Sequence, residues 1–505
     1  MILDKRLRHT PQITLQMSEQ SLKDKTAKGF LWGALNNGTM QILNAVFGIV
    51  IARILTQEDY GLVGMLLIFS TIAGALQDSG FVTALTNKKD ATHRDFNSVF
   101  WFNITCSFLL YIVLCAFSPL IAKVYDEPRL TSLACYQFVA FFISSFSIVP
   151  RAILFRNLQQ KELAIMSIIS LIISGTTGIG MALNGMAYWG IATQTIVYNL
   201  SNTAISWWLS GWRPSFKISL QPVREMFGFS SKMLITYIFN SINNNVFSVL
   251  LGLFYKADIV GTYNQANKWN LMGTQFITGM VQGVAQPTFV QVGNDMERLR
   301  RSFRKMLRFT SFVAFPCMFG LALIAPEFII ITITEKWLSS ANLMRILCIG
   351  GAFLPIATLY FNLIISRGKS NIYMWNIISQ GCAMTLTASL VHLLDLNFFG
   401  LTGVPLMIAL YVVILISWIF IWHYFLWREI RLPLFHALKD MGPFLIVASA
   451  AMLIAYYSTT WTDNVYLLLI LRIVIAAAIY IGVLWMLGTN ILKESLAYLM
   501  HRRQE

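Results

Sequence analysis

Fourteen apolar stretches, each about as long as a helix that crosses a bilayer, fill this 505-residue chain with only short polar segments between them. A helix needs roughly 20 apolar residues to cross the hydrocarbon core. Charged residues make up only 12% of the chain, whereas soluble domains carry about 25%. The pattern predicts an all-α polytopic membrane protein. It does not show the short alternating segments of an outer-membrane barrel.

The predicted transmembrane helices follow one another through nearly the whole chain. Their expected ranges are 29–55, 61–85, 97–122, 132–150, 162–183, 187–209, 230–254, 262–288, 307–333, 341–366, 371–394, 400–426, 440–458 and 464–487. The first 28 residues are polar and basic, and the apolar run after them is too long for the core of a signal peptide. We therefore expect a cytoplasmic N-terminal segment without a cleaved leader.

The net charge of +15 first suggests a nucleic-acid partner, but the positions of the charges argue against it. If the N-terminus is cytoplasmic, the cytoplasmic segments hold 30 of the 38 Lys and Arg residues and the outer loops hold four. This is the positive-inside pattern of membrane proteins. We therefore expect both termini in the cytoplasm, contact with anionic lipid and no nucleic-acid partner.

The cysteines and histidines give no sign of a disulfide framework or a metal site. All six cysteines fall inside predicted spans, and no CxxC or His-rich spacing occurs. We expect neither disulfides nor a bound metal.

The chain resembles itself at a shift of about 200 residues. The segment 43–48 lies over 243–248, and 58–61 lies over 258–261. A second register aligns Pro119 with Pro326, and Arg156 with Arg367. Each half then holds six spans, an even number, so both halves enter the membrane from the same side. The prediction is two six-helix halves related by a pseudo-twofold axis along the membrane normal, with a substrate site at the interface between the repeats.

This repeat sets the expected domain division. It consists of a cytoplasmic segment 1–28, a six-helix lobe 29–209, a cytoplasmic linker 210–229, a second lobe 230–426, two added helices in 427–487 and a cytoplasmic tail 488–505.

Polar side chains form stripes on the leading helices of both halves. They include Asn37, Gln41 and Asn44 in the first span, Asn240 and Asn244 in the seventh, and Asn264, Lys268 and Gln275 in the eighth. Each amide taken alone is explained by hydrogen bonds between helices. The stripes as a set favour the lining of a water-filled cavity.

Charged residues inside the spans are fewer. Arg53 and Lys268 lie toward the outer ends of their spans, where snorkelling to the interface is an alternative to a buried role. Asp78 is a mid-span acid that could pair with a base or carry a proton. Arg472 is interpreted as an interfacial anchor.

Several segments resemble one family of transporters. The opening 21–29, Trp32, the run 51–62 and the segments 78–81, 151–163 and 335–337 look like those of Wzx-type polysaccharide flippases, with the colanic-acid exporter branch the most similar. The likeness extends over about residues 21–490. It implies the MOP exporter fold shared with MATE transporters, which has two six-helix lobes around a central cavity and often two further helices.

The resemblance also implies a function. The expected substrate is an undecaprenyl-diphosphate-linked oligosaccharide, moved from the inner to the outer leaflet of the bacterial plasma membrane for O-antigen, capsule or exopolysaccharide synthesis. Alternating access would be driven by a proton or sodium gradient, with Asp78 as the candidate coupling residue and no other cofactor. Polymerase and assembly proteins are candidate partners.

Physical chemistry assigns candidate roles to the polar residues. A diphosphate needs cations in a medium of low dielectric, and Arg53 and Lys268 are the candidates. Sugar hydroxyls can pair with amides, so Asn37, Gln41, Asn44, Asn240, Asn244, Asn264 and Gln275 are expected along the glycan path.

Three alternatives remain open at this stage. A cation-coupled drug antiporter of the same superfamily would need more acids in its cavity than Asp78. A membrane polysaccharide polymerase or ligase would need a catalytic acid or base on a sizeable loop, which the short loops do not offer. A channel is disfavoured by the two-lobe repeat. We therefore predict a transporter that is not an enzyme.

Overall fold

The computed structural model is all-helical, which confirms the predicted fold class. It describes residues 32, 35–78, 85, 91–157, 159–216, 221–293, 295–398, 400–489 and 491. Over these residues the regular structure is helical, apart from one isolated bridge between Phe398 and Leu401. The expected N-terminal segment 1–28 and most of the expected tail 488–505 lie outside the described residues.

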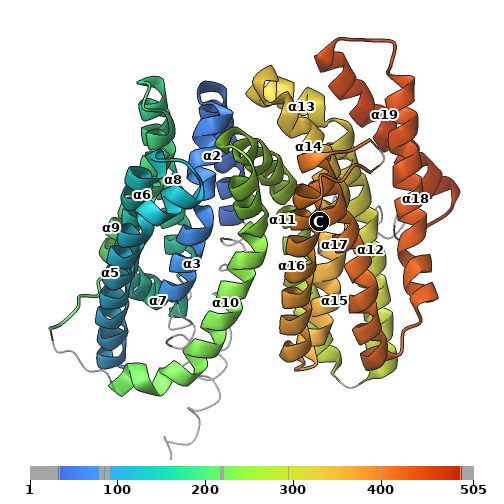
Figure 1. Cartoon of the computed structure of the whole chain (residues 1–505). Coiled ribbons are helices and arrows are strands. Elements are labelled where there is room, and N and C mark those ends of the chain that lie inside the picture. The colour runs from blue at the N-terminus through green and yellow to red at the C-terminus, as the bar shows by residue number, and fades with distance from the viewer. Residues whose placement is uncertain are drawn as a thin grey trace, which may run out of the picture. The chain divides into compact units, whose positions relative to one another are not determined.

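The helices form two compact units (Figure 1). The first comprises Met1–Thr56 and Leu66–Ser241, and the second comprises Gln57–Met65 and Ile242–Glu505. Helix α10 (Gln221–Phe254) runs from the first unit into the second. The expected linker 210–229 thus includes the irregular residues 211–216 and the first turns of α10. The domain boundaries taken from the sequence stay a prediction.

The first unit consists of apolar helices. They are Leu35–Ile54, α3 (Leu67–Asp78), α5 (His93–Val124), α6 (Arg129–Ser145), α7 (Ile148–Arg156), α8 (Gln160–Leu183) and α9 (Ala187–Ser210). Helix α6 packs between α5 and α9, and α8 packs on α9. The buried Phe100 ring meets Trp207 and Trp212 edge-on, so aromatic packing joins α5 to the end of α9.

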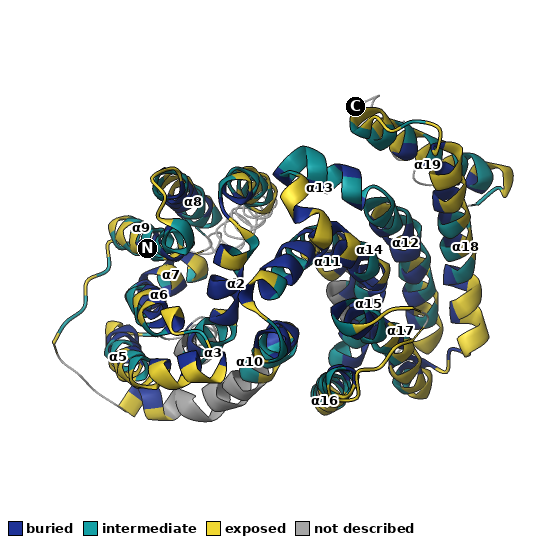
Figure 2. Ribbon diagram, turned by 45° about the horizontal axis from the view of Figure 1, so that its top comes forward, coloured by how far each residue is buried: buried dark blue, intermediate teal, exposed yellow. Residues whose placement is uncertain are grey.

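The second unit is built around α11 (Ala257–Val292). Its other elements are α2 (Gln57–Met65), α12 (Met296–Leu323), α13 (Ala325–Ile333), the 3-10 turn η1 (Glu335–Trp337), α14 (Leu338–Gly351), α15 (Leu354–Ser366), α16 (Ser370–Leu393), α17 (Gly403–Ile430), α18 (Leu434–Ser458) and α19 (Val465–Met486). Helix α11 packs against α2, α12, α14 and α15. Figure 2 shows α2 mainly in the colour of buried residues, as its covered position requires.

The outward faces of many helices carry large apolar side chains. On α17, Val413 and Phe420 are exposed, and on α19 Ile470 and Val474 are exposed. Such faces are stable against lipid and unstable against water. Over the described residues, eight helices are long and apolar enough to cross a membrane, or nine if the bent pair α6–α7 is one span. The protein is a multi-pass membrane protein, and the count of fourteen spans stays a prediction.

The internal repeat is also visible in the positions at which helices begin and break. The chain leaves helical structure at 55–56 and again at 255–256, which are 200 residues apart. Helices α8 and α16 both contain 24 residues and begin 210 residues apart, at Gln160 and Ser370. Both α6–α7 and α14–α15 break about four residues before a proline, Pro150 and Pro355. A proline has no N–H to bond the carbonyl four residues earlier, and its ring clashes with that carbonyl. These matches support a parallel repeat.

Candidate transport site

The polar stripe expected on the first span lies on the helix Leu35–Ile54. Asn37 and Asn44 are exposed, and Gln41 is half-buried. Arg53, in the last turn of this helix, is also exposed. Asp78 ends α3, but its side chain lies outside the described part of the chain. The roles of all five residues stay predictions.

The stripes on α10 and α11 meet each other in the second unit. The Ser248 hydroxyl donates a hydrogen bond of 2.7 Å to Oδ1 of Asn264. Helix α2 packs against the same amide, because a Cβ atom built on Gly64 would lie 2.0 Å from Nδ2 of Asn264. Asn264 therefore joins helices in this structure, whatever it does during transport.

The remaining amides of these two stripes are exposed, or their side chains are not described. Asn244 on α10 and Gln275 on α11 are exposed. The side chain of Asn240 lies outside the described residues. The roles of these three residues along the glycan path stay predictions.

Lys268 is the half-buried cation of α11. Its Nζ lies 5.9 Å from the centroid of the Trp269 ring, and Trp269 meets Phe328 edge-on at 4.9 Å. Among the described side chains, no carboxylate lies within ion-pair distance of Lys268. A half-buried ammonium without a carboxylate partner has unused capacity to bind an anion.

Helices α2 and α11 touch through their backbones. A Cβ on Gly61 would lie 1.7 Å from the carbonyl oxygen of Ala257, and a Cβ on Gly261 would lie 1.8 Å from that of Gln57. The contact is reciprocal, because Gln57 and Ala257, like Gly61 and Gly261, are 200 residues apart. The two halves of the sequence repeat therefore meet through equivalent residues.

Further contacts hold α2 in the second unit. Nε2 of Gln57 donates to the carbonyl oxygen of Lys336 at 2.5 Å and to the Ser339 hydroxyl at 3.2 Å. The Tyr60 ring meets the buried Trp337 edge-on at 5.4 Å. Although α2 and α3 belong to one predicted span, α2 packs in the second unit and α3 in the first, with the break at Leu66.

Arg472 is not the interfacial anchor that the sequence suggested. Its side chain is only 8% exposed, and Nη1 donates to Oε1 of Glu327 at 2.6 Å. Its Nε donates to the Thr459 hydroxyl at 3.3 Å. The pair fixes α13 to α19. The sequence could have indicated this pair, because an acid and a base inside membrane spans usually pair. The sequence analysis did not select Glu327.

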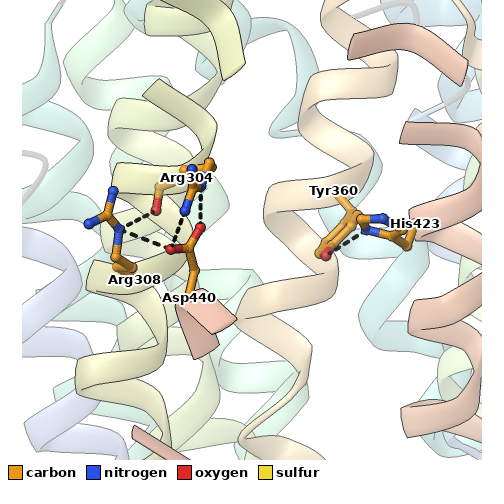
Figure 3. A network of polar contacts seen from close by, with 5 residues as sticks. All are labelled: Arg304, Arg308, Tyr360, His423 and Asp440. Carbon is orange, nitrogen blue, oxygen red and sulfur yellow. Dashed lines mark hydrogen bonds and ion pairs between the residues drawn. The ribbon is translucent and has the colours of Figure 1, made fainter. Parts of the chain in front are cut away.

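A second ionic cluster joins α12 to α18 (Figure 3). The buried carboxylate of Asp440 accepts hydrogen bonds from Nε and Nη2 of Arg304 at 2.5 and 2.9 Å, and Nε of Arg308 lies 3.4 Å away. Figure 3 also shows Tyr360 beside His423, whose Nδ1 lies 3.3 Å from the phenol oxygen. Asp440 was predicted only as the start of a span, so its structural role was missed.

An apolar groove of about 480 Å³ runs between α12, α18 and α19. Pro316, Met452 and Ala477 are among its lining residues, and Arg472 is its one charged member. A surface of this kind suits a hydrocarbon chain. None of the amides predicted along the glycan path lines it, so this groove does not correspond to the predicted glycan path.

A family model described as "Polysaccharide biosynthesis protein" matches residues 50–342, which is more than half of the chain. The chain belongs to the polysaccharide biosynthesis protein family. The match includes α2, α11 and the reciprocal glycine contact, whereas Asn37, Gln41 and Asn44 precede the matched region.

Characterised relatives have similar sequences over most of their length. The chain is 26% identical over 362 residues to the lipopolysaccharide biosynthesis protein WzxC of Escherichia coli (strain K12), covering 70% of this chain and 72% of that protein. It is 23% identical over 354 residues to the succinoglycan biosynthesis transport protein ExoT of Rhizobium meliloti (strain 1021), covering 70% and 72%. The resemblance to polysaccharide exporters is thereby confirmed.

Solved structures share the fold. The lipid II flippase MurJ in an inward closed conformation superposes with a TM-score of 0.72 at 16% identity, covering 93% of this chain and 100% of that one. An inward-facing MATE family transporter of the MOP superfamily gives a TM-score of 0.59 at 13% identity, covering 83% and 96%. The MATE-like fold expected from the sequence is confirmed.

Proposed function

We propose that this protein is a flippase that moves undecaprenyl-diphosphate-linked oligosaccharides from the inner to the outer leaflet of a bacterial plasma membrane. The observation that carries the proposal is the polysaccharide biosynthesis family match in a chain built of membrane helices. A sugar chain assembled on a lipid carrier has a charged, hydroxylated head that cannot cross hydrocarbon unaided. A protein of this family without a soluble domain in its described residues is suited to carrying that head.

The second unit supplies the best-supported contact for the diphosphate. Lys268 is half-buried and has no carboxylate partner among the described side chains. Phosphate oxygens would provide the charge-assisted partner that an ammonium in low dielectric requires. We place Arg53 in the same role from the first unit, and the amides from Asn37 to Gln275 along the glycan path.

Transport also needs a driving force, a fixed orientation in the membrane and a protein that receives the product. We propose alternating access driven by a proton or sodium gradient, with Asp78 as the coupling residue. Both termini would lie on the cytoplasmic side of the inner membrane. The excess of Lys and Arg in the segments between spans that are predicted to be cytoplasmic supports this orientation. A polysaccharide polymerase would take the product on the outer side.

The location of the accumulated intermediate tests the function directly. A deletion strain should accumulate lipid-linked repeat units on the cytoplasmic leaflet, where a membrane-impermeant glycosidase or lectin added to spheroplasts cannot reach them. Inverted vesicles from the same strain should expose them. Accumulation on the outer leaflet would reject the flippase and favour a polymerase or ligase. A deletion strain with normal lipid-linked pools and normal surface polysaccharide would reject a role in this pathway.

A further inference from the structure

The first turns of α12 carry a row of basic side chains on one face. The row consists of the exposed residues Arg298, Arg301 and Lys305, spaced three and four residues apart. Residues with this spacing lie on one side of a helix. On the opposite side, Leu299, Phe303 and Leu307 are fully buried against the unit. The segment is therefore amphipathic, with its basic face turned outward.

The inward-facing arginines of the same turns fix two other segments beside this row. Nε of Arg300 donates to the carbonyl oxygen of Ile430 at 3.0 Å, which holds the end of α17. Arg304 binds Asp440 through two hydrogen bonds, which holds the start of α18. The connection between α17 and α18 thus lies next to the basic row.

This connection adds cations and aromatic rings to the same surface. We define the basic–aromatic surface as Arg298, Arg301, Lys305, Arg428, Arg431 and Lys439 together with Tyr424, Trp427 and Phe435. The three added cations and three rings are exposed. The Arg431 guanidinium lies 5.0 Å from the centroid of the Trp427 ring.

Acidic residues are fewer than basic ones in the two segments that form this surface. Residues 295–308 and 424–440 contain nine Lys and Arg but four Asp and Glu. Asp440 is buried between two arginines, and Glu429 is bound by Lys369 and Arg367. The fully exposed pair Glu297 and Arg301 lies at 3.6 Å, a distance and exposure at which an ion pair contributes little. The surface keeps a positive surplus.

The surface also lies at the level where membrane-spanning helices end. Helices α12, α17 and α18 are each long and apolar enough to cross a membrane. The basic residues lie at the ends of these helices, where the apolar sequence stops. Cations and amphipathic rings at that level meet lipid headgroups rather than acyl chains.

We propose that the basic–aromatic surface is a binding site for anionic phospholipid headgroups. The cations of α12 would hold the lipid phosphates, while Trp427 and Phe435 would sit at the headgroup boundary. This inference does not depend on the proposed flippase activity.

The test uses the full-length protein purified in detergent. Dioleoylphosphatidylglycerol or dioleoylphosphatidylcholine is titrated in, with bound lipid counted by native mass spectrometry and the thermal midpoint followed in parallel. Phosphatidylglycerol should bind and raise the midpoint, and the effect should fade with added salt. The triple variant Arg298→Gln, Arg301→Gln and Lys305→Gln should bind it roughly a hundredfold more weakly, because each cation near an anionic surface contributes about a factor of five.

Two further variants separate lipid binding from general effects of charge. Arg298→Lys, Arg301→Lys and Lys305→Arg keep the charge and should keep the binding. Lys123→Gln with Lys256→Gln removes two exposed lysines from other helix ends and should leave binding unchanged. Equal binding of both lipids by the wild type, or undiminished phosphatidylglycerol binding by the triple variant, overturns the proposal. Binding of undecaprenyl diphosphate without any binding of phosphatidylglycerol would also overturn it, and would assign the surface to the substrate.

Discussion

Gly61 of α2 and Gly261 of α11 each leave room for the backbone of the other helix. A Cβ on Gly61 would meet the Ala257 carbonyl at 1.7 Å, and a Cβ on Gly261 would meet the Gln57 carbonyl at 1.8 Å. Real Cβ atoms do not approach a carbonyl oxygen this closely, so the two helices touch only because both residues lack side chains.

Alanine at either glycine should therefore destabilise the second unit. We expect Gly61→Ala and Gly261→Ala each to lower the free energy of unfolding by about 1–3 kcal/mol, because the helices must separate to accept the methyl group. Thermal unfolding in detergent measures the loss. Gly279→Ala in α11 is the matched control, since nothing lies within 4 Å of its Cβ. If the control and Gly261→Ala unfold at the same temperature, the close contact does not exist.

Reversal of charge at Lys268 should stop export without removing the protein from the membrane. Lys268→Glu places a carboxylate where the diphosphate is proposed to bind, whereas Lys268→Arg keeps the cation and should retain part of the activity. Arg53→Glu should behave like Lys268→Glu. Surface polysaccharide and membrane protein levels are measured together, with Lys256→Glu, at the exposed N-cap of α11, as the control. Normal surface polysaccharide in Lys268→Glu would remove this residue from the site.

The buried pair Glu327 and Arg472 should matter far more than an exposed pair. Glu327→Gln leaves Arg472 buried without its carboxylate and is expected to cost about 3–5 kcal/mol of stability. Glu327→Leu combined with Arg472→Met should recover most of that loss, because it leaves no unpaired charge. The exposed pair Glu297 and Arg301, at 3.6 Å, serves as the control, and Glu297→Gln should cost less than about 1 kcal/mol. Similar losses in the two single variants would contradict the burial of Arg472.

A double-mutant cycle on Ser248 and Asn264 separates packing from transport. Their hydrogen bond predicts a coupling of about 0.6 kcal/mol in thermal unfolding, the usual value between membrane helices. If Asn264 also lies on the glycan path, Asn264→Ala should reduce export more than Ser248→Ala does at equal protein level. Equal export in the two variants would leave Asn264 with a packing role alone.

The periodicity and length of the apolar stretches were sufficient to predict the helices. Each predicted span is occupied over its described residues by one helix or by two consecutive helices. The repeat offset was also visible, because breaks at 55–56 and 255–256 follow from residues that recur at that spacing. The apolar stretches and the recurring residues can be read directly along the chain, so a single sequence is enough to detect them.

The pairing of charges could not be predicted in the same way. Glu327 and Arg472 are 145 residues apart, and Arg304 and Asp440 are 136 apart. Which helices lie side by side depends on the tertiary packing of the unit, and helical periodicity fixes only the face on which a residue lies. The amide of Asn264 shows a related limit, because the chemistry that binds a sugar hydroxyl also binds a serine on the next helix.

The reciprocity of the α2–α11 contact has an evolutionary consequence. When residue i meets residue j and the counterpart of j meets the counterpart of i, the surface is self-complementary, as in a twofold dimer. A half-length ancestor with one such glycine could have paired with its own copy through this patch. Gene duplication and fusion would then have turned an association between two chains into an internal contact, and each half could afterwards change its other residues independently.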